Sequence, residues 1–484
     1  MRSVAALYGL SSPPVEQARV LELGCAVGGN LLPMAYRFPE ARFVGVDLSA
    51  RQIETARSSA ARLGLTNVDF RQMNIAEIGP DFGTFDYIIA HGVYSWVPRE
   101  VRDAILRICR DNLAGDGVAY VSYNVYPGWH LQRWVREMMT CAARRPDGSL
   151  DVARAREFLK VAAGSPAINK HVAGWLAHEA QQLESKPDTY LFHEYLEEVN
   201  EPVYFQEFIA HAARWGLKYL ADARFNATML DESWPAGQRM LKPFADDPVY
   251  VEQLSDFLRN RTFRRSLLCH EGAALDRNGA AQRIRNMWIA SGLRRDLSAV
   301  GLPPEVHRFV TPRGGYVHTN HPAAKACLAL LQERCPQPTK FDELVERAAA
   351  AMPGADRQSL AAELANQMYH YWKLELIEIQ AAPITFVATV SERPQASAVA
   401  RLQAEESGQV TNLRHEMVRL DEACRRLLPL IDGTRTREEL ARKALEDRLL
   451  PLAPGLSEEA VAKAAAEKVN AVLNVMARNA LLVG

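Results

Sequence analysis

Several features that would assign a chain to a class are scarce or missing in this sequence. The seven cysteines are an odd number scattered over 484 residues, and none of them forms a Cys-x-x-Cys pair. This pattern argues against a disulfide framework, so we expect free thiols, a reducing cytoplasm and no metal site. No apolar run is long enough to span a bilayer, and no signal peptide precedes the first expected strand.

An excess of charge of one sign is missing as well. The formal net charge is -1 and the pI is near 6.9, so no global field steers the chain toward nucleic acid, although a local basic patch stays compatible with these values. The hydrophobic content of 48% and the charged content of 24% are those of a soluble globular protein. At 484 residues the chain exceeds one core, and two to four domains are expected.

The most informative stretch is Arg19 to Asn30 (RVLELGCAVGGN), together with Phe43 to Ser49 (FVGVDLS). The apolar run before Gly24 predicts a buried parallel strand that enters a tight turn. Helical spacing follows from Leu31, and a second buried strand ends in Asp47. A strand, a glycine turn, a helix, a strand and an acid are typical of a nucleotide-binding βαβ unit.

Charge indicates which nucleotide this unit binds. Gly24, Ala26 and Gly29 fit the dinucleotide spacing only in part, and Glu22 would face a pyrophosphate unfavourably. S-adenosylmethionine carries an ammonium and a sulfonium and no phosphate, so Glu22 favours it. Asp47 can accept two hydrogen bonds from the ribose hydroxyls. The alternative is a βαβ crossover without a ligand.

Residues at the ends of the next three expected strands would join the same crevice, because ligands of open α/β sheets bind beyond the carboxyl ends of the strands. The third strand (VDFRQMN) ends at Asn74, which is either an adenine-binding residue or a plain turn residue. The fourth strand is Phe85 to Gly92, and the fifth is GVAYVSYN. The crevice would contain His91, Gly92, Tyr94, Trp96, Tyr123, Asn124 and Trp129. The aromatic residues among them suggest an aromatic wall for a substrate. For Trp129 and Trp96 the alternative is an aromatic core under loops.

The chain from Asp151 to Ser185 is amphipathic and helical, which predicts a lid inserted into the core. Pro202 would then open a helix that Gly216 closes, and Leu217 to Ala221 would form the sixth strand. We predict an antiparallel seventh strand at Thr262 to His270.

The C-terminal part contains two segments with the same order of elements, Phe309 to Ile379 and Met417 to Val483. Each predicts a small winged-helix-like unit, and Thr436 with Glu439 forms a capping box in the second. The helices FDELVERA and TREELARKA are acidic or mixed, which favours protein contact or dimerisation over DNA binding. Residues 391–412 read as a connector. The expected domains are 1–145, 146–190, 191–275, 300–385 and 400–484.

The chain resembles class I methyltransferases with a methyltransferase regulatory domain, in particular bacterial, including rickettsial, protein-lysine methyltransferases of outer-membrane proteins. The resemblance rests on LELGCAVGGN, VGVDLS, FDYIIAHGVYSWVP, YVSYNVYPGW, HEYLEEVNEPVYF and LIDGTRTREEL. It implies an α/β fold with a Rossmann-like core of seven strands, a helical insertion and a mostly helical C-terminal region. It also implies S-adenosylmethionine as cofactor and a protein substrate. The aromatic and proline-rich segment that usually precedes the first helix in this family is missing here.

The cofactor-binding residues that follow from motif and resemblance are Glu22, Gly24, Cys25, Ala26, Gly28, Asn30, Asp47, Leu48, Asn74, Ile75, His91 and Gly92.

A lysine acceptor must lose a proton before it attacks a methyl group. With an ordinary pKa of about 10.4, only about one amine in 10³ is neutral at pH 7, a deficit near 4.6 kcal/mol. An apolar pocket and a general base reduce this deficit. We predict Tyr94 and Trp96 as catalytic pocket residues, Trp129, Tyr123 and Asn124 as substrate-binding, and His193 and Glu194 as bases. A charge cluster at a helix start is the alternative for His193 and Glu194.

Two other functions stay open at this point. One is a small-molecule N- or O-methyltransferase whose C-terminal part serves oligomerisation. The other is a regulatory protein that senses the cofactor with little or no turnover.

Overall fold

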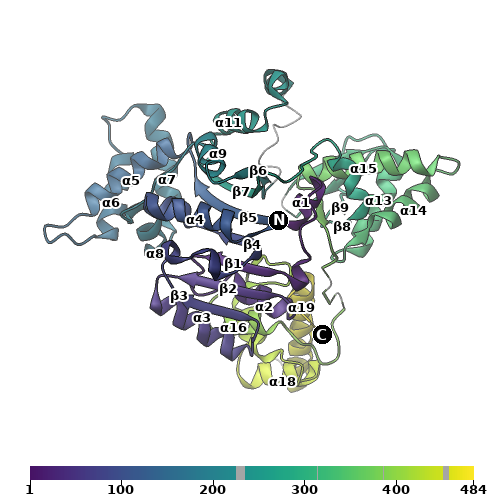
Figure 1. Cartoon of the computed structure of the whole chain (residues 1–484). Coiled ribbons are helices and arrows are strands. Elements are labelled where there is room, and N and C mark those ends of the chain that lie inside the picture. The colour runs from purple at the N-terminus through teal and green to yellow at the C-terminus, as the bar shows by residue number, and fades with distance from the viewer. Residues whose placement is uncertain (225–234, 313, 385, 388, 451–456, 484) are drawn as a thin grey trace. The chain divides into compact units, whose positions relative to one another are not determined.

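A mixed sheet of seven strands in the computed structural model confirms the expected α/β fold (Figure 1). The structure describes residues 1–224, 235–312, 314–384, 386–387, 389–450 and 457–483. The strand order is β3-β2-β1-β4-β5-β7-β6. β1, β2 and β3 pair in parallel, as do β4 and β5, and β7 is antiparallel to both β5 and β6. The strands are β1 (Arg19–Leu23), β2 (Arg42–Asp47), β3 (Val68–Gln72), β4 (Phe85–Ala90), β5 (Leu113–Asn124), β6 (Leu217–Asp222) and β7 (Phe263–His270).

The chain divides into two compact units. The first combines Met1–Met73 with Ala273–Gly484, and the second is Asn74–Gly272. In the first unit α1 (Arg2–Leu7) precedes β1, and the parallel strands are joined by α2 (Leu31–Arg37) and α3 (Ala50–Arg62). Parallel pairing requires such crossovers. The side chain of Ser49 caps α3 by accepting a hydrogen bond from the Gln52 amide at 3.4 Å.

Residues 280–380 of the first unit form two small sheets and a group of helices. The sheets have the orders β12-β8-β13 and β11-β10-β9. Strand β8 precedes residue 300, so the secondary structure here begins before the expected domain boundary. The elements are α12 (Ala280–Arg283), β8 (Trp288–Ala290), β9 (Arg294–Arg295), β10 (His307–Val310), β11 (Tyr316–Thr319), α13 (Pro322–Arg334), β12 (Thr339–Lys340), α14 (Phe341–Ala351), α15 (Arg357–Lys373) and β13 (Glu378–Gln380).

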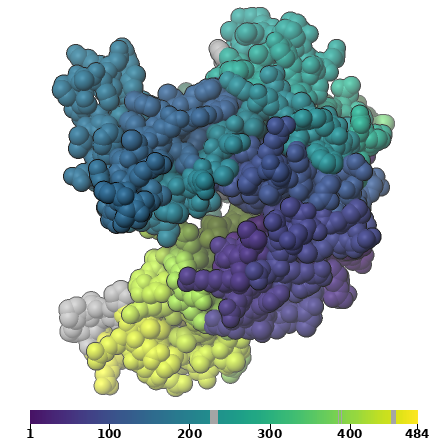
Figure 2. Space-filling model, turned by 60° about the vertical axis from the view of Figure 1, so that its left-hand side comes forward, coloured from purple at the N-terminus to yellow at the C-terminus, as the bar shows by residue number. Residues whose placement is uncertain are grey.

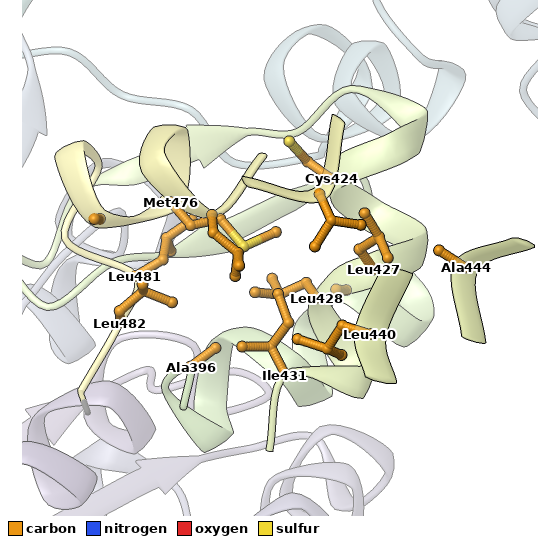
Figure 3. Packing of buried hydrophobic residues seen from close by; sticks show 14 of the residues in the cluster. Ala396, Cys424, Leu427, Leu428, Ile431, Leu440, Ala444, Met476, Leu481 and Leu482 are labelled. Atoms are coloured by element: carbon orange, nitrogen blue, oxygen red, sulfur yellow. The ribbon is translucent and has the colours of Figure 1, made fainter. Parts of the chain in front are cut away.

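The C-terminal region has its own hydrophobic core, which Figure 3 shows. Leu427, Ile431, Leu440 and Met476 are almost completely buried in it. The predicted capping box is confirmed, because Thr436 and Glu439 each accept a hydrogen bond from the backbone amide of the other. The elements are α16 (Ala398–Glu406), β14 (Gln409–Thr411), β15 (Met417–Arg419), α17 (Glu422–Leu427), α18 (Arg437–Glu446) and α19 (Glu458–Arg478).

The predicted connector at residues 391–412 is wrong. It contains α16 and β14, and Ala400, Ala404 and Val410 are buried in the C-terminal core. Small alanine side chains produce a weak apolar pattern, so this helix is stabilised chiefly by tertiary packing that the sequence pattern does not reveal.

The second unit surrounds its strands with helices. The helical segment expected between Asp151 and Ser185 is present as α6 and α7, which share a core with α5. The helix expected from Pro202 begins only at Phe205, because Val203 instead forms a parallel bridge with Val125. The helices are α4 (Arg99–Asp111), α5 (Trp129–Ala143), α6 (Val152–Ala163), α7 (Lys170–Glu184), α8 (Asp188–Leu191), α9 (Phe205–Ala213), α10 (Pro235–Leu241) and α11 (Pro248–Arg259).

Within the described residues, every helix is too short or too polar to cross a bilayer.

Candidate active site

The turn after β1 is held in a conformation that suits close approach of a ligand. Gly24, Ala26 and Gly28 have φ values of 72°, 48° and 76°, in the left-handed region that glycine adopts most easily. A Cβ on Gly28 would lie 2.6 Å from Cζ of Phe70, so this position requires glycine. Such a turn presents backbone rather than side chains along its path.

Asp47 ties this turn to the end of β2. Its Oδ2 accepts a hydrogen bond from the Ala26 amide at 2.9 Å, and its Oδ1 accepts one from the Ser49 amide at 2.9 Å. Each carboxylate oxygen has a second lone pair, so Asp47 can hold the turn and still accept hydrogen bonds from two hydroxyl groups.

Glu22 places a carboxyl group under the turn. Its side chain is 4% exposed, and its Oε1 accepts a hydrogen bond from Nδ2 of Asn30 at 2.8 Å. Its Oε2 is buried with no hydrogen-bond partner among the described residues. Burial raises the pKa of Glu22 from 4.5 to about 8. A buried acceptor of this kind fits a ligand that carries positive charge.

The other predicted cofactor residues have varied surroundings. The Cys25 thiol is buried, which raises its pKa to about 12 and makes it a packing residue rather than a nucleophile. Leu48 is 69% exposed next to Asp47. In the second unit, Asn74 accepts a hydrogen bond from the Ala76 amide at 3.0 Å, and Ile75 is buried. His91 follows β4 and stacks on Tyr120, and the Gly92 amide donates to Ser122.

A pocket of about 370 Å³ lies in the second unit. The predicted residues Gly92, Trp96, Asn124, Trp129, His193 and Glu194 all line it, together with Gln132, Tyr190, Tyr195, Thr262 and Phe263. Gly92 follows β4, Trp96 ends the 3-10 turn Tyr94–Trp96, and Asn124 ends β5. Trp129 begins α5, and His193 and Glu194 lie in the π-helical turn Phe192–Leu196. The structure thus brings together six residues that span about a hundred positions of sequence.

Two groups in this pocket define its chemistry. The rings of Trp96 and His193 stack with centroids 4.5 Å apart. Glu194 is half-buried, and burial raises the pKa of its carboxyl group, while the Arg136 guanidinium acts in the opposite direction. A carboxyl group whose pKa is raised in a pocket lined by aromatic rings is a candidate for proton transfer.

Tyr94 and Tyr123 do not line this pocket. Tyr94 is 2% exposed, with its hydroxyl 2.7 Å from Nδ1 of His211. Tyr123 is 1% exposed, with its hydroxyl 2.8 Å from Oγ of Ser266 and its ring on Phe208. Both rings belong to the core of the second unit and not to the aromatic substrate wall that the sequence predicts, because their hydroxyl groups find buried partners.

Five lining residues were missed by the sequence analysis. Tyr190 and Tyr195 flank His193 and Glu194 within four positions, so the same stretch already carried a signal for them. Thr262 precedes β7 and Phe263 is its first residue; β7 pairs with β5, which brings Phe263 opposite Asn124. Gln132 lies one helical turn after Trp129 in α5, a spacing that places both on one face.

A glycine turn closed by an acid, a buried carboxyl group under the turn and a seven-stranded sheet define a class I methyltransferase. Three family models match the chain: a methyltransferase domain at residues 20–117, a predicted methyltransferase regulatory domain at 187–270, and the PKMT C-terminal winged helix domain at 392–481.

Similar proteins that match most of the chain include two from Rickettsia species. The uncharacterized protein RP789 of Rickettsia prowazekii (strain Madrid E) is 34% identical over 460 residues, which cover 92% of this chain and 82% of that protein. The structure of PKMT2 from Rickettsia typhi is 28% identical and covers 100% of this chain and 97% of its own, with a TM-score of 0.89. PKMT2 in complex with AdoHcy superposes with a TM-score of 0.87. The trans-aconitate 2-methyltransferase of Rhodopseudomonas palustris (strain BisB18) is 34% identical over 90 residues, 19% of this chain and 33% of that enzyme.

The chain belongs to the family of S-adenosylmethionine-dependent methyltransferases that carry a methyltransferase regulatory domain and a PKMT-type winged helix domain.

Proposed function

We propose that the enzyme methylates lysine side chains of a protein substrate. The observation that carries this proposal is the pocket of the second unit, which Trp96, Trp129 and Phe263 line together with the half-buried Glu194. The likeness to PKMT2 over the whole chain supports the same acceptor class.

The residues of the glycine turn fit the methyl donor. S-adenosylmethionine, when bound, supplies a methyl group on a positively charged sulfur. Glu22 would hold the cationic part of the donor through its unpaired Oε2, and Asp47 would accept hydrogen bonds from the ribose hydroxyls. We assign to the same ligand the backbone of Gly24, Cys25, Ala26 and Gly28, and the side chains of Asn30 and Leu48. Asn74, Ile75, His91 and Gly92 stay predictions of cofactor-binding residues from the sequence.

The pocket residues would prepare the acceptor amine. Aromatic walls remove water from a lysine side chain and lower its pKa. The Glu194 carboxylate would then take the remaining proton, with His193 as the second base candidate stacked on Trp96. Both effects reduce the deficit of about 4.6 kcal/mol that a charged lysine presents at pH 7.

A tritiated-methyl transfer assay on cell extract tests this proposal. Incubation of the enzyme with labelled S-adenosylmethionine and extract should place label in a protein band, and acid hydrolysis should recover it as methyl-lysine. Label that stays in a solvent-extractable fraction would contradict a protein acceptor. Saturable cofactor binding without transfer to any fraction would point to a cofactor-sensing regulator.

Trp96→Ala gives a second test, directed at the pocket. We expect the variant to bind cofactor normally but to lose about tenfold or more in kcat/KM for the acceptor, because one stacked wall of the pocket is removed. Phe192→Ala is a suitable control, since Phe192 is 42% exposed beside His193 and does not line the pocket. Normal turnover of Trp96→Ala would remove the pocket assignment.

A small-molecule acceptor is the second candidate. Its support is the 90-residue likeness to trans-aconitate 2-methyltransferase. This likeness covers less than a fifth of the chain, and the assay on extract separates the two candidates directly.

A further inference from the structure

The C-terminal winged helix contacts the N-terminal βαβ segment within the first unit. Figures 1 and 2 both show the C-terminal residues (yellow) beside the N-terminal ones (purple). Arg62 of α3 forms an ion pair with Glu405 of α16 at 2.5 Å. Arg37 of α2 donates a hydrogen bond to the carbonyl of Leu413, in the hairpin between β14 and β15. The hairpin is thereby placed against the helix that follows the cofactor turn.

His415, at the tip of this hairpin, continues the contact into the turn itself. Its Nε2 lies 2.6 Å from Oδ1 of Asn30, and Nδ2 of the same Asn30 donates to Oε1 of Glu22 at 2.8 Å. An amide oxygen only accepts hydrogen bonds, so Nε2 of His415 must carry the hydrogen. The three side chains therefore form a directed chain of donors from His415 through Asn30 to Glu22.

The hairpin is built to hold His415 in place. Asn412 is 3% exposed, and its Oδ1 accepts hydrogen bonds from the amides of Arg414 and Glu416, each at 2.9 Å. The Leu413 amide donates to the carbonyl of Ala480 at 2.9 Å. His415 itself has a φ of 62°, a left-handed conformation that these contacts maintain.

The charged neighbours favour this arrangement. The protein around the ring and the Arg37 guanidinium lower the pKa of His415, which keeps the imidazole neutral with a single hydrogen. Arg414 and Glu416 flank it and pair with each other at 2.9 Å. On the other side, the Cys25 thiol interacts electrostatically with both Glu22 and Asp47, and burial keeps this thiol protonated.

We propose that His415 is a positioning residue for the methyl donor, and that it acts by fixing the Asn30 amide so that Asn30 holds Glu22 as a carboxylate. The proposal rests on the proposed role of Glu22 in binding the cationic cofactor. Hydrogen bonds to the charged form of a carboxyl group favour that form. Without His415 the Asn30 amide is free to rotate, Glu22 stays protonated to higher pH, and a cation binds less well near neutral pH. The winged helix then takes part in cofactor binding through His415, which lies 385 residues after Asn30 in the sequence.

Two substitutions of His415 isolate the hydrogen bond. His415→Asn keeps a residue type that accepts a positive φ but is too short to reach Asn30. His415→Gln restores a donor close to the position of Nε2. Met417→Ala is the matched control, because Met417 is 64% exposed in the same hairpin and carries no charge. Should His415→Asn fail to fold, His415→Gly carries the same test, since glycine also accepts this φ.

Calorimetric titration of the full-length chain with S-adenosylmethionine, without acceptor, is the measurement. Near pH 7 we expect His415→Asn to weaken binding by about two- to tenfold, the range of one net hydrogen bond. The loss should shrink near pH 9, where Glu22 ionises without assistance, so the midpoint of the pH profile moves upward. His415→Gln should restore most of the affinity and the midpoint, and Met417→Ala should match the wild type.

Two results would overturn the proposal. One is a His415→Asn profile identical to the wild type at every pH. The other is an equal loss at all pH values that His415→Gln does not restore, which would mean a packing contact only. Glu22→Gln distinguishes a failure of the proposed role of Glu22 in cofactor binding from a failure of the proposed role of His415. If it binds the cofactor like the wild type, the role of Glu22 fails; if it loses binding while His415→Asn does not, the role of His415 alone fails.

Discussion

At the scale of single residues, Glu22 combines burial with a missing partner for one oxygen. The folded chain raises its pKa from 4.5 to about 8, so the folded state binds a proton that the unfolded state releases between these values. This group therefore contributes stability below about pH 4.5, and the contribution is lost as the pH rises through about 8. An ionised carboxyl group in such a place lowers the stability of the cofactor-free protein, but it strengthens the binding of a cationic ligand.

The stability of the cofactor-free protein should therefore depend on pH through the ionisation of Glu22. We expect the Tm of the wild type to fall, relative to that of Glu22→Gln, as the pH is raised from about 5 to about 9, because the variant carries no buried charge at high pH. Differential scanning calorimetry across this range checks it. Two parallel curves would mean that Glu22 ionises normally. Glu16→Gln, at a more exposed carboxyl group, serves as control.

Glu194 is the second residue whose ionisation matters. If it is the general base, kcat in the wild type rises with pH through the raised pKa of its carboxyl group. We expect Glu194→Gln to lower kcat by about 10²- to 10⁴-fold and to abolish that rise. Glu198→Gln, at an exposed carboxyl group that does not line the pocket, should keep the wild-type profile. An unchanged profile in Glu194→Gln would exclude it as the base.

At the scale of elements, α11 is joined to β7 by buried charges rather than by an apolar face. Arg264 of β7 is fully buried, and it pairs with Asp256 and Glu252 of α11, each at 2.8 Å. Its guanidinium also lies 3.8 Å from the ring centre of Phe205. Removal of one member of such a group leaves uncompensated buried charge, which costs about 3–5 kcal/mol.

Arg264→Met should therefore reduce the local stability of α11. Methionine has a volume close to that of arginine, so the variant removes the charge without leaving a large cavity. We expect amide hydrogen exchange in α11 and β7 to accelerate by roughly 10²- to 10⁴-fold, as a local cost of about 3–5 kcal/mol implies. Arg133→Met removes an exposed pair with Glu137 and should change exchange in α5 very little. Equal protection of α11 in the wild type and in Arg264→Met would show that the buried charges are dispensable.

At the scale of the whole molecule, the winged helix at residues 392–481 carries no excess of basic over acidic residues, which DNA binding would require. In α18, Arg437 already donates to the carbonyls of Val390 and Ser391, and Lys443 pairs with Asp447 at 2.8 Å. The formal net charge of the chain is -1. We expect no mobility shift of duplex DNA at about 150 mM salt, and any shift at low salt should vanish steeply as salt is added. A sequence-dependent shift at this salt concentration would contradict a protein-contact role for the domain.

The sequence by itself determined the βαβ unit with its glycine turn, Glu22 and Asp47, because these residues lie within thirty positions and local spacing positions them. It also determined the seven strands, whose apolar runs and turn residues agree locally with the sheet. Tertiary structure alone decided which strand-end aromatics face a pocket and which face the core: Tyr94 turns inward to His211, and Trp96, two positions later, does not. It likewise decided that α16 is a helix, because Ala400 and Ala404 pack into a core built from the whole C-terminal region. It also decided that His415 meets Asn30, 385 residues away, which local spacing does not encode.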